Sequence, residues 1–579
     1  MESSWPLDIA GRTAARESRI PSVILLLLLG CVYSQGLSQN SPRADRAPQI
    51  KALFEAERWG ELVQEVELSP ARGVEVDFYY GSALAHLGRW REARAAFLEG
   101  RRLSPRDERF PIELGGVAFE QKHYAEAAHW LRQGLRLAPH DAYAQNFLAT
   151  IFFLEGNTEA ALKYWNGVSK PQLERVRFGP GLRVDPALLD RAVTFAPSST
   201  LRLPEFLTTR TRVEGLGIFP ASNWRLEALE NGKFDMTFQG QERDGWGTSK
   251  WETLVSTFRG AFYQTAYPEY FNWGGRATNL SSLVRWDAQK RRLLASLSGP
   301  LGQNPKYRYQ ISFDLRNEDW QLRQSFKGPA PVLGALNLRR GALFGQITSL
   351  NSGRWSWLTG AELSDRDYRN VFVGPSLPPG VLLSGVLLKQ HSRLDYQWVR
   401  VPEKRFESKA SIDSQAGTIW SAPAHSFEKL QGSVSTHWYP QISGDDYALA
   451  WKIRSGKTWG MAPFDELFML GMERDNDLWM RAHVGTRDGM KGSAPLGRDY
   501  FLSNWEIDKL IYHNGFFSLK LSPFLDTGKI TDPLSGLGSG RWLWDTGVQA
   551  KFRVLGVGVT LVYGKDLRTG HGGFYATAQ

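Results

Sequence analysis

The residues that could carry out catalysis do not form a recognisable active-site pattern in this 579-residue sequence. It contains no Gly-x-Ser-x-Gly elbow, no His-Glu-x-x-His motif and no Gly-x-x-x-x-Gly-Lys-Ser/Thr phosphate loop. The ten histidines are dispersed, and the carboxylate pair Asp365 and Asp367 falls where we expect a solvated connection. The single cysteine, Cys31, excludes an intrachain disulfide and a cysteine-based metal site. We therefore predict that the protein is not an enzyme and uses neither a cofactor nor a metal.

The composition favours a chain of many strands and turns. Aromatic residues make up 12% of the sequence, with 22 tryptophans, and there are 57 glycines. The mean hydropathy of −0.35 excludes a helical membrane bundle but not a membrane barrel, whose strands alternate apolar and polar residues. The formal net charge is +10, but the 70 lysines and arginines are scattered rather than clustered. We therefore predict no nucleic-acid partner.

The first 36 residues have the features of an export signal. Arginines precede the apolar run Val23–Leu29, which is too short to span a bilayer. Two cleavage patterns follow this run. Leu28-Leu29-Gly30-Cys31 resembles a lipoprotein box and would place a lipid on Cys31, whereas Val32-Tyr33-Ser34 suits ordinary signal peptidase. We predict a signal peptide over residues 1–36, and the sequence leaves both cleavage patterns open.

Residues 48–168 are rich in Ala, Leu and Glu and contain a repeat with a period of 34 residues. Small residues within a unit would let two helices approach closely, and a proline after the second helix would end it. The pattern resembles the tetratricopeptide repeat, in about three units, and this resemblance implies a concave face for an accessory protein. The alternative is a plain helical spacer. The repeated positions are Gly81, Ala93 and Pro105, then Gly115, Ala127 and Pro139.

Residues 170–244 predict a small α+β domain with the order β-α-α-β-β. Its pattern resembles that of a POTRA domain, which precedes the barrel in some outer-membrane proteins and takes up unfolded client chains, partly by adding a client strand to a sheet edge. The alternative is a generic α+β linker domain. The expected elements are a strand over Leu173–Phe178, a helix over Pro186–Val193 capped by Asp185, a helix from Pro204 to about Glu214, and a strand pair joined by the Asn231-Gly232 hairpin.

Residues 246–579 predict an antiparallel transmembrane β-barrel. Apolar and polar residues alternate from Tyr307 to Arg316 and again from Val548 to Val554. Charged residues in mid-strand, such as Lys551 and Arg553, suit a wet lumen enclosed by a lipid-facing wall better than a sandwich core. The length allows roughly 14 to 18 strands. A soluble pair of sandwiches or a propeller is the alternative.

One stretch of this segment has a distinctive pattern, in which Pro463 to Gly471 leads into Leu478 to His483. This stretch resembles the BamA, TamA and two-partner-secretion superfamily of outer-membrane barrels, the bacterial surface antigen type. In that superfamily, a Phe-x-x-Gly stretch leads into an Arg-Gly-aromatic motif at the tip of a long loop folded into the lumen, and Arg481 matches the motif's arginine. Ala482 and His483 replace the glycine and the aromatic residue, so the chain departs from the pattern there. The resemblance implies a barrel of about 16 strands.

Two later stretches resemble the strands that hold the superfamily's loop. Tyr500 to Glu506 matches the strand with an inward glutamate, and Pro523 to Gly528 matches the Asp-x-Gly strand that carries Asp526. A guanidinium inside a lumen requires acidic partners, and its planar fork can hold two carboxylates. We predict that Arg481 pairs with Asp526, Glu506 or both. The alternative is that these are three unrelated lumen charges of a passive pore.

The resemblance also implies a location and a function. The barrel would lie in the bacterial outer membrane, in contact with its lipid, and the N-terminal domains would lie in the periplasm. The protein would insert unfolded client proteins into that membrane or translocate secreted ones across it. Outer-membrane exopolysaccharide exporters also join tetratricopeptide arrays to barrels but lack POTRA domains. An export conduit of that kind, or a passive porin with a periplasmic repeat scaffold, is therefore the alternative.

Overall fold

The computed structural model describes residues 47–68, 72–323, 332–374, 379–441, 444–514, 517–532, 537–554 and 557–578. The predicted signal peptide and Cys31 lie outside these residues. The chain divides into two compact units, residues 1–113 and 114–579, which are considered separately. No helix in the described ranges has the length and apolar character needed to cross a membrane.

The first unit contains helical hairpins whose helices pack closely at small residues. A Cβ built on Gly81 would lie 2.6 Å from the ring of Phe97, so only glycine fits between these two helices. Ala93 is fully buried beside this contact. Pro105 follows the second helix of the hairpin, as the repeat predicts. The helices are α3 (Ala47–Glu55), α4 (Trp59–Glu67), α5 (Val74–His86) and α6 (Trp90–Leu103).

The same packing recurs one repeat later, in the second unit. A Cβ on Gly115 would approach Leu131 to 2.8 Å, and Ala127 is fully buried. Asp141 begins the following helix by accepting a hydrogen bond from the backbone N–H of Ala144. Helical hairpins therefore extend through the region where the sequence predicts them. These helices are α7 (Arg109–Glu120), α8 (Tyr124–Leu137), α9 (Ala142–Leu154) and α10 (Thr158–Trp165).

An α+β domain follows, with the expected order β-α-α-β-β. Its sheet has the order β1-β3-β2, in which β1 runs parallel and β2 antiparallel to β3. Asp185 caps the first helix and a proline occupies its first turn, while Gly217 adopts a φ of +72° after the second. Trp224 and Phe238 pack together in its core. The elements are β1 (Leu173–Phe178), α11 (Pro186–Ala192), α12 (Leu203–Gly215), β2 (Ala221–Ala228) and β3 (Phe234–Gln241).

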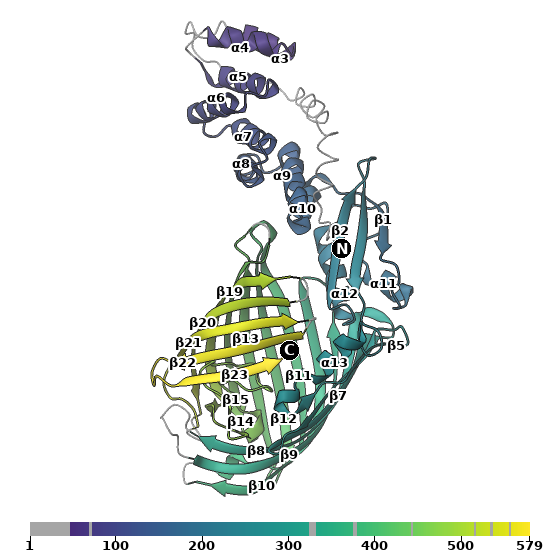
Figure 1. Ribbon diagram of the computed structural model, residues 1–579, viewed down its shortest axis with the longest axis vertical. Coiled ribbons are helices and arrows are strands. Elements are labelled where there is room, and N and C mark those ends of the chain that lie inside the picture. The colour runs from purple at the N-terminus through teal and green to yellow at the C-terminus, as the bar shows by residue number, and fades with distance from the viewer. Residues whose placement is uncertain are drawn as a thin grey trace. The chain divides into compact units, whose positions relative to one another are not determined.

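The rest of the chain forms an antiparallel sheet that curls into a barrel, with strands in sequence order from teal β5 to yellow β23 (Figure 1). The described residues form sixteen wall segments. Because β4 and β5 both pair with β6 and act as one interrupted strand, these segments make fifteen strands, close to the expectation of about 16. The segments are β4 (Thr265–Ala266), β5 (Glu269–Trp273), β6 (Thr278–Trp286), β7 (Lys290–Leu301), β8 (Asn304–Arg323), β9 (Val332–Ser349), β10 (Trp355–Val373), β11 (Gly385–Val401), β12 (Phe406–Trp420), β13 (His425–Trp438), β14 (Tyr447–Gly460), β19 (Asp499–His513), β20 (Phe517–Thr531), β21 (Leu543–Val554), β22 (Val557–Asp566) and β23 (Gly572–Ala578).

The wall strands are apolar outside and polar inside. On β8, the side chains of Ile311, Phe313 and Leu315 are 41–52% exposed. Between them, Asp314 accepts hydrogen bonds from Arg292 on the neighbouring strand. An apolar outer surface with paired charges inside is the pattern of a membrane barrel and is opposite to that of a soluble sandwich.

Two features of the barrel differ from the sequence expectations. The first strand begins at Thr265 rather than near residue 246, because Lys250–Phe258 forms helix α13. Asp365 and Asp367 lie within β10, not in a connection. This strand is 19 residues long, whereas about 9–11 residues span a bilayer, so its end can extend beyond the lipid and carry charge.

Gly81→Ala tests the helix contact in the first unit. The added methyl group would overlap the ring of Phe97, and such overpacking costs about 1–3 kcal/mol. Hydrogen exchange of the full-length chain should therefore speed up in α5 and α6. Gly60→Ala in α4 is the control, because a Cβ there meets no atom within 4 Å. Equal exchange in the two variants would show that the close approach at Gly81 contributes nothing to the hairpin.

Candidate functional site

The connection between β14 and β19, residues 461–498, lies inside the barrel and is called the lumen loop here. It contains the short helix η6 (Phe464–Glu466), and its two-residue strands β15 (Phe468–Met469) and β18 (Leu496–Gly497) pair with each other. Loop residues pack on the inner surface of three wall strands. These contacts form an apolar cluster. The loop contributes Phe468, Leu470, Leu478 and Met480, and the wall strands β19, β20 and β21 contribute Tyr500, Leu502, Ile530 and Leu543.

Arg481 makes both ion pairs that the sequence predicts. Its Nε and Nη2 atoms donate to the two oxygens of Asp526, at 2.8 and 2.6 Å, in a bidentate contact. Its Nη1 donates to Glu506 at 2.7 Å, and its backbone N–H donates to Asp526 at 3.0 Å. The guanidinium also lies 3.9 Å from the ring centroid of Phe524. Arg481 is 4% exposed and Asp526 is fully buried, so these contacts are shielded from solvent.

The two residues that depart from the superfamily motif have acidic partners of their own. The backbone N–H of Ala482 donates to Asp545 at 2.7 Å. The Nδ1 of His483 lies 3.0 Å from the same carboxylate, and its Nε2 lies 4.0 Å from Asp566. Histidine thus places a second potential cation beside Arg481. Asp545 and Asp566 were not predicted as site residues, because they lie on β21 and β22 outside the alternating stretch from Val548 to Val554.

A second group of ion pairs holds the lumen loop to β6, β7 and β8, which are among the first strands of the barrel wall. Asp475 forms ion pairs with Arg285 on β6 and Arg292 on β7, at 3.1 and 2.6 Å. Lys491, also in the loop, lies 2.8 Å from Asp475 and 2.7 Å from Glu318 on β8. None of these residues was predicted from the sequence, because the loop residues lie 173 to 190 positions along the chain from their partners on the wall.

A third contact lies at η6. Asp465 accepts a hydrogen bond from the hydroxyl of Tyr368 at 2.8 Å. The carboxylate of Glu466 is 2.9 Å from the Nζ of Lys389, and its backbone carbonyl accepts a hydrogen bond from the Nζ of Lys429 at 2.7 Å. The fully buried Arg366 lies 3.5 Å from both loop carboxylates. Three groups of charges therefore hold one loop to most of the barrel wall.

The lumen loop carries charges of both signs, and each group pairs with opposite charges on the wall. Asp475 and Glu466 pair with cations on β6, β7 and β11, whereas Lys491 pairs with Glu318 on β8. The cationic segment from Arg481 to His483 pairs with carboxylates on β19 to β22. No group of three or more His, Cys, Asp or Glu residues in the described ranges could hold a metal ion. The arrangement is suited to fixing a loop by ion pairing.

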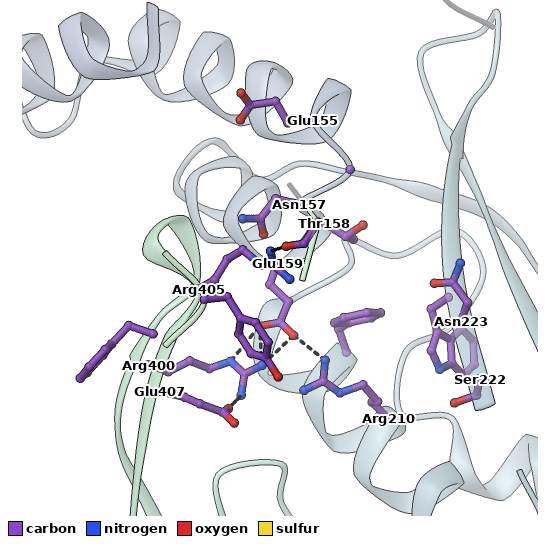
Figure 2. A pocket seen from close by; sticks show the side chains of 16 residues that line it. Glu155, Asn157, Thr158, Glu159, Arg210, Ser222, Asn223, Arg400, Arg405 and Glu407 are labelled. Atoms are coloured by element: carbon purple, nitrogen blue, oxygen red, sulfur yellow. Dashed lines mark hydrogen bonds and ion pairs between the residues drawn. The ribbon is translucent and has the colours of Figure 1, made fainter. Parts of the chain in front are cut away.

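A second candidate site is a cavity of about 550 Å³ at the junction of α10, the α+β domain and the barrel (Figure 2). Glu159 on α10 accepts hydrogen bonds from Arg210 on α12 and from Arg400 on β11, the latter at 2.7 and 2.8 Å. Arg400 also donates to Glu407 at 3.1 Å. The far side of the cavity is formed by Ser222 to Trp224 of β2.

The barrel turn beside this cavity provides further contacts to α10. Lys163 lies 2.6 Å from Glu403, and the hydroxyl of Tyr164 donates to the same carboxylate at 3.2 Å. Burial is the largest single influence on the pKa of Glu403 and would raise it, but the hydrogen bonds to this carboxylate and the charge of Lys163 together outweigh burial and hold the pKa below its usual value. Asn157 donates to the carbonyl of Pro402 at 3.0 Å. The last helical hairpin is therefore fastened to the barrel as well as to the α+β domain.

Comparisons with known proteins return only distant structural likenesses. No family model and no curated protein sequence matches the chain. Solved structures similar to it include BamA from Haemophilus ducreyi lacking POTRA domains 1–3, at 13% identity, covering 70% of this chain and 84% of that one, with a TM-score of 0.41. CdiB from Escherichia coli is 14% identical over 71% and 77% of the two chains, with a TM-score of 0.47. CdiB from Acinetobacter baumannii is 11% identical over 77% and 81%, with a TM-score of 0.41.

Arg481→Lys tests the central ion pairs. A lysine keeps the charge but loses the bidentate contact with Asp526 and the simultaneous contact with Glu506, and charge-assisted hydrogen bonds contribute about 1.5–3 kcal/mol each. The lumen loop of the purified protein should therefore become more sensitive to added protease. The barrel should also unfold at a lower temperature in a gel-shift assay.

Arg487→Lys provides the matched control for this substitution. Arg487 lies in the same loop but is exposed, so the same chemical change should leave protease sensitivity and unfolding temperature unchanged. If Arg481→Lys behaves like this control, the ion pairs at Asp526 and Glu506 do not hold the loop.

Glu159→Gln tests the junction. The substitution would leave Arg210 and Arg400 close together without the carboxylate between them, at a cost of about 1–3 kcal/mol. Hydrogen exchange should increase in α10 and in the turn at residues 402–405. Glu155→Gln, in the same cavity lining, should have little effect. Unchanged exchange in Glu159→Gln would mean that the apolar contacts of α10 are sufficient to fasten it.

Proposed function

We propose that this protein resides in the bacterial outer membrane and inserts client proteins into it or translocates them across it. The observation that carries the proposal is the position of Arg481. The residues through which the sequence resembles the BamA and two-partner-secretion superfamily are the ones that meet inside the barrel, at Glu506 and Asp526.

The lengths of the connections at the two ends of the barrel support an orientation in the membrane. One end carries short turns, such as residues 302–303 and 402–405, and the α+β domain is attached there: Asp185 donates a backbone hydrogen bond to Gly275 at 2.7 Å. Membrane barrels of bacteria have short turns on the periplasmic side and long loops outside. We therefore place the helical repeats and the α+β domain in the periplasm.

A client chain would first meet these periplasmic domains. In the sheet order β1-β3-β2, strand β2 has β3 on one side, and its other edge has no strand partner among the described residues. An extended client segment could pair with this edge through its backbone. Ser222 and Asn223 of β2 also line the junction cavity, which would accept client side chains beside the barrel. The helical repeats would hold an accessory protein or a further part of the client.

The lumen loop favours protein handling over a passive conduit. An exopolysaccharide channel or a porin requires a continuous water-filled path, whereas residues 461–498 lie inside this barrel and pack on β19, β20 and β21. Client folding and the burial of apolar surface in lipid would supply the free energy, because the sequence contains no nucleotide-binding motif.

The test uses the full-length protein in liposomes of phosphatidylethanolamine and phosphatidylglycerol. We expect it to accelerate the assembly of an added unfolded barrel protein, or to move an unfolded secreted protein into the liposome. Arg481→Lys should slow that activity and Arg487→Lys should not. Liposomes that pass dextran freely but leave both protein substrates unaffected would overturn the proposal in favour of a polysaccharide conduit.

A further inference from the structure

Helix α13, between the α+β domain and the first barrel strand, has its apolar side turned away from the protein. Trp251, Leu254 and Phe258 lie on one face, because their spacing of three and four residues brings them together on a helix. Their exposed fractions are 73%, 53% and 55%, and none of the helix's nine residues is buried. A helix packed on a protein in water normally has the opposite orientation.

The polar side of the same helix is the side bonded to the protein. Glu252 accepts hydrogen bonds from Arg243 at 3.0 Å and from the backbone of Thr248 at 2.9 Å. At the end of the helix, Arg259 forms an ion pair with Glu269 of β5 at 3.2 Å. The orientation of α13 is thus set by specific polar contacts, and its apolar face is presented outward.

Helix α13 lies next to β4, at the first strands of the barrel, whose outer surface is also apolar. Just before the helix, the ring of Trp246 meets that of Tyr270 on β5 edge-to-face, with centroids 5.4 Å apart. Tyr270 in turn contacts Trp273, which is 60% exposed. Across the ladder, Val284 and Trp286 of β6 are also outward and exposed. Exposed apolar residues therefore occur both on α13 and on the first wall strands beside it.

We propose that α13 is a lipid-contacting helix that lies along the first edge of the barrel, with Trp251, Leu254 and Phe258 in the bilayer. The inference rests on the proposed placement of the barrel in a membrane. Trp and Phe opposite a polar face are typical of helices that lie in the interface of a bilayer rather than across it. Lipid is the occupant that the structure favours, because the exposed face is formed by large apolar side chains and lies beside barrel strands whose outer surface is also apolar.

Position-specific fluorescence in liposomes tests this placement. Residues 47–579 contain no cysteine, so a Cys31→Ser chain accepts a single probe at a chosen site. An environment-sensitive fluorophore is attached at Leu254→Cys, or at Phe258→Cys on the same face in case the first variant fails to fold. Ser256→Cys, on the opposite face of α13, is the matched control. Leu343→Cys reports a lipid-facing position on β9, where the native side chain is 54% exposed.

Nitroxide-labelled phosphatidylcholine should quench the probes at 254 and 343 at least about twofold more than the probe at 256, and aqueous iodide should quench them less. Lipid quenching at 343 together with strong iodide quenching at 254 would overturn the inference and make the face of α13 a water-exposed docking surface. Lipid quenching at neither 254 nor 343 would instead reject the membrane placement on which the proposed function depends.

Discussion

The pairing of charges inside the barrel is the constraint on which the rest of the structure depends. A buried ion without a counter-ion costs several kcal/mol, so each buried charge on the lumen loop requires a partner of opposite charge. Arg481 has two, Asp526 and Glu506, and Asp475 has three cations around it. The wall partners lie on early strands of the barrel, β6 and β7, and on late strands, β19 and β20. The loop and the wall therefore hold each other in place.

The pairing of loop charges with opposite charges on the wall determines where the loop can lie. Rotating the loop within the lumen would separate Asp465 and Asp475 from their cations and Arg481 from its carboxylates, and unpaired buried charges are costly. The apolar cluster of Phe468, Leu470 and Met480 against β19 to β21 reinforces the same position. These contacts stabilise the position of the loop while they are formed. They are contacts between side chains, so they can exchange partners without breaking the backbone hydrogen bonds between the barrel strands.

Outside the lumen, the exposed side chains must be apolar rather than charged. The outer surface of β8 is apolar, and α13 also presents apolar side chains outward because its polar side is bonded to Arg243 and to the region of β5. At the turn end, by contrast, the protein is again held by ion pairs, with Glu159 shared between Arg210 and Arg400. A membrane barrel with attached aqueous domains requires an apolar outer surface, and it also requires buried polar contacts where the domains are attached.

Periodicity was readable from the sequence, and contact between distant residues was not. Alternation around Ile311 predicted strands, the 34-residue period predicted helical hairpins, and motif resemblance selected Arg481, Glu506 and Asp526. These signals are local or rest on a known pattern. Asp475 and Arg292 are 183 residues apart, and only the register of the curled sheet brings them together. A shift of one residue would turn Arg292 to the lipid, so pairing across the lumen is decided by the tertiary structure. The same holds for α13, whose residues have no strong strand pattern and whose outward apolar face has meaning only beside a lipid-facing wall.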